Sequence, residues 1–292
     1  MKTMKTLTTA MQAYANTHSL ECTEQVIKTD LKGVSFYYSS TSTPRRPLLY
    51  QSGIIIMGQG HKRIHLADES VSYGVGDYLV IGVPLPLECE AFSSSNEPLL
   101  SLCIDVDLPL LNTLVEKLNT SIPNPGKSSR GLQKAQVTSD LEDACIRLLK
   151  CLEDKTEMAI FGKDLVKEIV YRVLTGPQGN TLMGLVQQDS HYARIAKVLS
   201  KLHGNFSSPI NVDELAQEAN MSVSAFHRAF KEVTCDSPMQ YVKKVRLDKA
   251  KELITIEGKR ASEAANLVGY SSQSQFFREF KRHFQLSPSQ MT

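Results

Sequence analysis

Two stretches fifty residues apart carry the same pattern of aromatic and basic residues: Phe226-His227-Arg228-Ala229-Phe230-Lys231 and Phe276-Phe277-Arg278-Glu279-Phe280-Lys281. Two phenylalanines in each stretch stand four residues apart, so on a helix they share one face, while the basic residues lie on another. A repeated pattern of this kind indicates a duplicated structural unit. The C-terminal part of the chain is therefore predicted to contain two similar helical units.

Each repeat has the parts of a helix-turn-helix. A short helix carries a small residue where two helices cross closely, and a turn residue that tolerates a positive φ comes next. A serine then caps the second helix. In the two repeats these residues are Ala216 and Ala265, Asn220 and Gly269, and Ser222 and Ser272. Such a unit places its second helix in the major groove of DNA.

The polar face of each second helix is predicted to contact DNA. Arginine bonds guanine bidentately, glutamine pairs with adenine, and serine adapts to several acceptors. The predicted base-reading residues are Ser224, His227, Arg228, Gln273, Ser274, Gln275 and Arg278. The predicted phosphate contacts are Ser222, Lys231, Lys243, Lys244, Arg246 and Lys281.

Residues 239–254, between the repeats, show a continuous helical pattern. About sixteen residues at 1.5 Å each span about 24 Å. A rigid connector of that length can hold two reading helices about one DNA turn (~34 Å) apart on one face of the duplex. Charge agrees with this prediction: from Tyr192 onward the chain has 15 Lys and Arg against 10 Asp and Glu, whereas the remainder is net acidic.

The upstream part is organised differently. Residues 23–111 show short apolar runs separated by Gly, Pro and Ser, a pattern typical of an all-β sandwich or barrel. Residues 121–131 are predicted to form a linker, and residues 139–175 a helical pair that buries its apolar stripe within its own domain or against a second subunit. The predicted domains are 1–120, a β effector or dimerisation domain; 132–190, a helical linker region; and 192–290, a DNA-binding domain.

Composition excludes several other classes of protein. No run of eighteen apolar residues is present, so no transmembrane helix is expected. The threonine-rich start lacks the apolar core of a signal peptide and is interpreted as an amphipathic first helix, so the protein is predicted to be cytoplasmic. The six cysteines show no CxxC or zinc-ligand spacing, and reduced thiols are expected.

The C-terminal third resembles the DNA-binding domain of the AraC/XylS family. The sequence MSVSAFHRAFK (221–231) is similar to that family's first reading helix, and VGYSSQSQFFREFK (268–281) with Ser287-Pro288 to its closing signature. By this resemblance the base contacts fall on Ser224, His227 and Arg228 in the first unit. In the second unit they fall on Gln273, Ser274, Gln275 and Arg278.

The upstream part resembles the N-terminal module of an AraC-type subgroup, which is thought to be cupin-like. The matching stretches are PLLY (47–50), GQGHK (58–62), GDYLV (76–80) and VPLPL (83–87). The predicted architecture is therefore multidomain: an N-terminal cupin-like β-barrel, a helical linker or dimerisation region, and a C-terminal all-α domain with two helix-turn-helix units. A small-molecule effector in the barrel is expected to contact Arg45, Arg46, Arg63 or Tyr78.

Metal chemistry has weak support in the sequence. A cupin metal site needs a His-x-His pair, but Arg63, a cation that cannot ligate metal, stands two residues before His65. His61 lies four residues away from His65. No metal or cofactor is predicted. The preferred interpretation is a transcription regulator, not an enzyme, that binds double-stranded promoter DNA. Its other expected partners are RNA polymerase, a small-molecule effector and a second copy of the chain. No association with a membrane is expected.

Three alternatives remain open at this point. The first is a metal-dependent cupin enzyme with an appended helical domain. The second is a ligand-independent activator. The third concerns the barrel alone, which could be filled by its own side chains and serve only in dimerisation.

Overall fold

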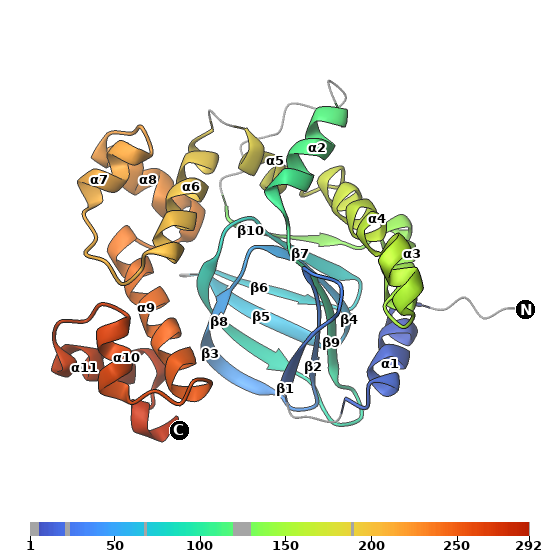
Figure 1. Ribbon diagram of the computed structural model, residues 1–292, viewed down its shortest axis with the longest axis horizontal. Helices are drawn as coiled ribbons and strands as arrows, with labels where there is room; N and C mark the ends of the chain where they lie inside the picture. Colours follow the sequence, from blue (N-terminus) through green and yellow to red (C-terminus); the bar gives the residue numbers. More distant parts are fainter. Residues whose placement is uncertain (1–5, 21–23, 67–68, 119–129, 188–189, 292) are drawn as a thin grey trace, which may run out of the picture.

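The computed structural model describes residues 6–20, 24–66, 69–118, 130–187 and 190–291. A β domain occupies the centre of the molecule, with helices on two opposite sides of it (Figure 1). The strands are β1 (Glu24–Lys28), β2 (Val34–Ser39), β3 (Thr43–Tyr50), β4 (Gly53–Gln59), β5 (His61–Leu66), β6 (Glu69–Gly74), β7 (Asp77–Ile81), β8 (Leu85–Phe92), β9 (Leu99–Ile104) and β10 (Leu132–Gln136).

The strands form two antiparallel sheets that face each other. One has the order β1-β2-β9-β4-β7-β10 and the other β3-β8-β5-β6. The predicted fold class is confirmed, with one difference: within the described residues no hydrogen-bonded ladder joins the two sheets, so they are not closed into a barrel. Two separate twisted sheets are held together by interdigitated side chains instead.

The strand sequences explain which residues fill the space between the sheets. In β5, Lys62, Ile64 and Leu66 are buried, whereas His61 and Arg63 point outward, as the period of two requires. β7 is buried along its whole length, because the second sheet covers one face and helices cover the other. The last strand, β10, comes from beyond residue 130 and pairs with β7.

Helices cover the outer face of the six-stranded sheet. They are α1 (Leu7–Thr17), α2 (Leu108–Leu118), α3 (Ser139–Cys151), α4 (Lys155–Leu174) and α5 (Asn180–Val186). The amphipathic first helix is confirmed from Leu7 onward, and Met11 and Tyr14 on it are buried against the sheet. Residues 1–5 lie outside the described part of the chain.

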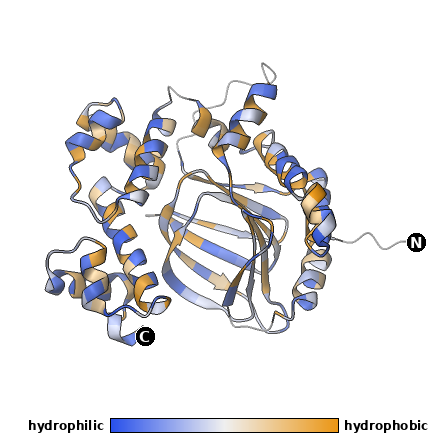
Figure 2. Ribbon diagram, viewed as in Figure 1, coloured by the Kyte–Doolittle hydropathy of each residue, from blue (hydrophilic) through white to orange (hydrophobic). Residues whose placement is uncertain are grey.

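The C-terminal domain consists of helices, and the two predicted helix-turn-helix units are present in it. Its elements are α6 (His191–Gly204), α7 (Val212–Glu218), α8 (Val223–Thr234), α9 (Pro238–Thr255), α10 (Ala261–Leu267), α11 (Gln273–Phe284) and the 3-10 turn η1 (Pro288–Gln290). The units are α7 with α8 and α10 with α11. In both, hydrophobic and hydrophilic segments alternate along the helices, as expected for elements with one buried face (Figure 2).

The predicted turn residues have the expected backbone. Asn220 has φ 50° and Gly269 has φ 88°. At Gly269 any Cβ would lie 2.1 Å from the Ser207 carbonyl oxygen, so only glycine fits there. Because the second turn packs this closely on the loop before α7, the two units are locked together.

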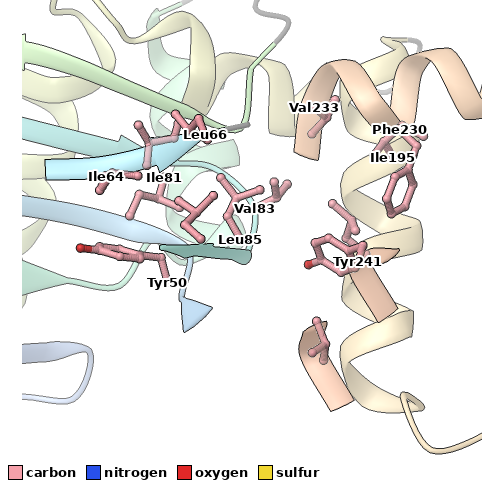
Figure 3. Packing of buried hydrophobic residues seen from close by; sticks show 14 of the residues in the cluster. Tyr50, Ile64, Leu66, Ile81, Val83, Leu85, Ile195, Phe230, Val233 and Tyr241 are labelled. Carbon is pink, nitrogen blue, oxygen red and sulfur yellow. The ribbon is translucent and has the colours of Figure 1, made fainter. Parts of the chain in front are cut away.

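An apolar interface joins the C-terminal domain to the β domain. Val83 and Leu85 of the β domain face Val233 of α8 and Tyr241 of α9 (Figure 3), and all four belong to one buried cluster. The Gly131 amide also donates to the Val233 carbonyl at 2.9 Å. The two domains are therefore docked on each other in this structure.

Candidate DNA-binding surface and effector site

The first reading helix, α8, presents its predicted polar face to solvent. Ser222 is the N-cap, and its hydroxyl accepts from the Ala225 amide at 3.3 Å. Phe226 and Phe230 are fully buried and anchor the helix. The side chains predicted to contact DNA are exposed: Ser224, His227, Arg228 and Lys231.

The second reading helix, α11, repeats this construction. Ser272 caps it by accepting from the Gln275 amide at 3.3 Å, and Phe276, Phe280 and Phe284 form its buried stripe. The predicted contact residues are again exposed: Gln273, Ser274, Gln275, Arg278 and Lys281.

The two matched arginines are free to bind. Within the described residues, Arg228 and Arg278 make no hydrogen bond and no ion pair, whereas Gln275 donates to Glu279 at 3.4 Å. An unpaired guanidinium on an exposed helix face can offer its donors to a base edge without first breaking an internal contact.

The connector α9 is a continuous helix of 18 residues, about 27 Å long. Its three predicted phosphate contacts differ in their surroundings. Lys243 is half-buried and makes no ion pair within the described residues. Lys244 contacts both carboxylate oxygens of Asp236 at 2.8 Å.

Arg246, the third of these residues, is engaged inside the domain. Its guanidinium donates to the carbonyls of Phe206 at 2.7 Å, Ser208 at 2.8 Å and Gly269 at 3.4 Å. Phe206 and Ser208 precede the first unit, and Gly269 forms the turn of the second. The structure thus gives Arg246 a bracing role that fixes how the two units sit relative to each other.

The four residues predicted to bind an effector do not come together. Arg45 pairs with Glu88 at 2.5 Å near the domain interface. Arg63 points outward and donates to Ser72 at 3.3 Å. Tyr78 is buried on the opposite face of the six-stranded sheet, in the cluster formed with the outer helices. Arg46 alone lies beside the group described next.

A lysine, Lys62, is buried between the sheets with only 7% of its surface exposed. It extends from β5 across to β2, where its Nζ lies 3.8 Å from the centroid of the Tyr37 ring. Within the described residues the ammonium makes no hydrogen bond and no ion pair. Burial lowers the pKa of Lys62. An unpaired buried cation is costly, so this position is a candidate binding site for a ligand that would satisfy it.

Tyrosine hydroxyls and thiols share this interior with Lys62. The Tyr50 hydroxyl lies 3.1 Å from that of Tyr73 and donates to the Cys89 thiol at 3.2 Å. Burial raises the pKa of Cys89 and of Cys103, so both thiols are protonated at neutral pH. The cysteines in the described part of the chain are free; Cys22 lies outside it.

An ion pair lies between this interior and the domain interface. The Tyr37 hydroxyl donates to Glu24 at 2.9 Å, and Arg46 binds both oxygens of that carboxylate at 2.5 Å. Burial alone would raise the pKa of Glu24, but Arg46 outweighs it and the pKa is lowered. Pro47 and Leu48, which follow Arg46 on β3, line one pocket with Lys251 of α9, so this segment lies against the C-terminal domain. Burial and then the charge of Arg46 lower the pKa of Lys251.

Sequence reasoning missed Lys62, Tyr37, Tyr50 and Tyr73. The alternation of Lys62 with Ile64 and Leu66 is the signal that marks the lysine as inward-facing. The tyrosines carry no such signal, since an aromatic residue in a strand is ordinary core. Their convergence depends on which strands of the two sheets face each other.

The histidines considered as metal ligands are engaged otherwise. His65 Nε2 lies 2.5 Å from Glu90 Oε1 on the neighbouring strand β8. The His61 ring stacks on Phe92 with centroids 4.4 Å apart. Over the described ranges, no three His, Cys, Asp or Glu side chains gather as a set that could hold a metal ion.

Comparison with known families identifies the class of protein. The family model described as AraC-type transcriptional regulator N-terminus matches residues 30–181, more than half of the chain. A helix-turn-helix domain model matches residues 215–292. The chain belongs to the AraC-type transcriptional regulators, and the resemblance found in the sequence is confirmed.

Curated relatives match about a third of the chain. The probable transcriptional regulator LumQ of Photobacterium leiognathi is 35% identical over 118 residues, which are 38% of this chain and 48% of LumQ. The regulator AlkR of Acinetobacter baylyi is 32% identical over 97 residues, 33% of this chain and 32% of AlkR. The matched part therefore spans about half of LumQ and a third of AlkR.

Among solved structures, most of the chain is similar to ToxT of Vibrio cholerae. A crystal structure of ToxT with a bound unsaturated fatty acid has a TM-score of 0.62 at 12% identity, and the match covers 88% of this chain and 93% of that one. At this identity the likeness shows a shared fold. In the part of this chain that the structure describes, no helix has the length and apolarity needed to span a membrane.

Proposed function

We propose that this chain is a sequence-specific transcription regulator that binds double-stranded promoter DNA in the cytoplasm and acts there on RNA polymerase, and that it is not an enzyme. The observation that carries the proposal is the matched pair of exposed arginines, Arg228 and Arg278, on two reading helices joined by one rigid helix. Capped, aromatic-anchored helices hold these side chains in place, which is the arrangement that direct base readout requires.

The experiment is in vitro selection from a random duplex library with the purified full chain. The expected result is a site with two conserved blocks about one helical turn apart, one for each reading helix. Enrichment of a single block would show that the second helix-turn-helix unit takes no part in DNA recognition. Absence of any enriched sequence, while binding persists at low salt, would overturn sequence-specific regulation.

We further infer that an effector binds between the sheets through Lys62. Apolar side chains, tyrosine hydroxyls and thiols surround the ammonium, so the site suits a ligand with an apolar body and one anionic group. The fatty acid bound in the ToxT crystal structure has that chemistry and supports this class of ligand. A ligand bound at Lys62 would shift the Tyr37 ring. The Tyr37 hydroxyl is hydrogen-bonded to Glu24, and Glu24 is paired with Arg46 beside α9, so the shift would reach the C-terminal domain.

The effector proposal is tested with aliphatic carboxylates of short and long chain in a thermal-shift assay. Oleate is expected to stabilise the wild type and not Lys62→Met, and oleyl alcohol, which lacks the charge, to stabilise neither. Lys28→Met is the matched control, because Lys28 is an exposed lysine on β1. Equal shifts in the wild type and Lys62→Met, or shifts with the alcohol alone, would contradict anion binding by Lys62. No shift with any probe would favour a regulator that works without a ligand.

A further inference from the structure

The two reading helices carry different side chains at one position of their shared pattern. His227 on α8 and Phe277 on α11 stand fifty residues apart, each between a buried phenylalanine and an arginine. The His227 ring meets the ring of Phe226 at 70°, with the centroids 6.4 Å apart. The Phe277 ring meets the ring of Phe276 in the same way, at 68° and 5.6 Å. Phe277 therefore takes in the second unit the place that His227 takes in the first.

Phe277 is an exposed aromatic residue on a helix whose other phenylalanines are buried. Phe276, Phe280 and Phe284 form the stripe that anchors α11, whereas Phe277 is 40% exposed. Within the described residues, Phe277 belongs to none of the buried hydrophobic clusters. Packing inside the protein therefore does not account for this ring, which faces water in the free chain.

The exposed ring lies on the face of α11 that is predicted to contact DNA. Residues three and four positions apart are neighbours on a helix surface, so Phe277 lies beside Ser274 and Lys281. Both of these residues are exposed, and so is Arg278, the next residue along the chain. A helix that enters the major groove with Ser274 and Arg278 toward the bases brings the Phe277 ring to the base edges as well.

The chemistry of a phenyl ring favours one feature of the major groove. The ring has no N–H or O–H donor and no nitrogen or oxygen acceptor, so it cannot read the hydrogen-bonding edge of a base. The C5 methyl group of thymine is the apolar group that the major groove presents, and phenylalanine is among the residues that contact it. Packing the ring against a polar base edge instead would remove water from that edge without replacing its hydrogen bonds.

We propose that Phe277 determines specificity by packing against the C5 methyl group of a thymine in the DNA block that α11 reads. The inference rests on the proposed function and names one base of the site. This thymine is expected at or beside the base pair that Arg278 contacts, because the two residues are consecutive on the helix. His227 offers ring nitrogens at the matching place of α8, so the two blocks are expected to differ there.

The first test removes the methyl group alone. Uracil pairs with adenine as thymine does and lacks only the C5 methyl group, so one deoxyuridine in place of thymidine isolates this contact. Competition binding with the full chain measures the effect in the block that Arg278→Ala identifies. At one thymine of that block, uracil is expected to weaken binding about fourfold, as for one buried methyl-sized group. Uracil tolerated at every thymine of the block, or a block without thymine, overturns the proposal.

The second test combines the change in DNA with changes in the protein. Phe277→Ala is expected to bind the thymine and uracil sites equally, and Phe277→Leu, which keeps an apolar side chain, to retain part of the preference for thymine. A purely structural role of the ring would weaken binding to both sites by the same factor and leave the preference intact, which overturns the proposal.

Leu286→Ala is the matched control for these variants. Leu286 is an apolar residue of similar exposure, 44%, that lies beyond the end of α11. Its replacement is expected to keep the wild-type preference for thymine. Loss of the preference in Leu286→Ala as well as in Phe277→Ala would mean that the discrimination depends on the packing of the domain and not on the Phe277 ring.

The wild type itself separates this inference from the proposed function. A wild type that selects two blocks but tolerates uracil throughout the second keeps the proposed function and loses the thymine contact. A wild type that enriches no sequence removes both.

Discussion

The Tyr241 hydroxyl on α9 donates to the Pro84 carbonyl, just before β8, at 2.7 Å. The same oxygen lies 2.7 Å from His203 Nε2 on α6. Because a hydroxyl has one proton, and that proton goes to Pro84, the imidazole must be the donor in the second bond. Burial lowers the pKa of His203 to about 4, so this ring is neutral near pH 7. Tyr241 therefore ties the DNA-binding domain to the β domain through a buried hydrogen-bond chain.

Replacement of Tyr241 by Phe is expected to loosen this docking. The change keeps the ring but leaves a buried carbonyl and an imidazole N–H without their partner, at about 1–3 kcal/mol. The free energy of unfolding in urea measures the loss, and proteolysis between the domains reports their separation. Tyr171→Phe, on the outer helix α4, serves as the control. If both variants match the wild type, the Tyr241 hydroxyl does not hold the domains together.

Arg228→Ala and Arg278→Ala are each expected to weaken binding to a selected site by about 1–3 kcal/mol and to relax preference at one base position. Each change should affect a different block of the site, because the two residues lie on different reading helices. Competition binding with single-base variants of the site measures this. Specificity that remains intact in both variants would place the reading face elsewhere on α8 and α11.

Lys243→Ala is expected to weaken binding to all DNA sequences alike and to reduce the slope of log affinity against log salt by about one. Lys244→Ala should change that slope less, because Lys244 is already paired with Asp236 and must give up this contact to reach a phosphate. Titrations at several salt concentrations compare the two. A sequence-dependent loss in Lys243→Ala would argue for base contact instead.

Asp248 on α9 makes stability depend on pH. Burial raises its pKa from 3.8 to about 7 against the opposing charges of Lys251, Lys244 and Lys249, and its Oδ2 has no hydrogen-bond partner in the described structure. A carboxylic acid whose pKa is higher in the folded protein than in the unfolded chain stabilises the fold most at a pH below its unfolded pKa. This contribution to the free energy of unfolding is lost as the pH rises toward about 7.

Asp248→Asn is therefore expected to lose less stability than the wild type between about pH 5 and about pH 8. Unfolding free energies at both pH values measure the difference, with Asp213→Asn, an exposed aspartate on α7, as control. Parallel curves for the wild type and Asp248→Asn would mean that the carboxylate is solvated in solution.

Sequence alone determined the DNA-binding domain in detail. The turns at Asn220 and Gly269, the caps at Ser222 and Ser272 and the buried phenylalanines are local features. Each depends on residues within one or two helical turns, so spacing is enough to predict them. The exposed face that remains follows from the same periodicity.

Only the tertiary structure decided which charged residues are engaged inside the protein. Arg246 and Lys243 look alike in the pattern of α9, but Arg246 is held by three carbonyls, two of them some forty residues away along the chain. The unpaired ammonium of Lys62, the two sheets in place of one barrel and the docking of Tyr241 on Pro84 likewise depend on contacts between distant segments. Such contacts are set by how whole surfaces fit together, which no local period encodes.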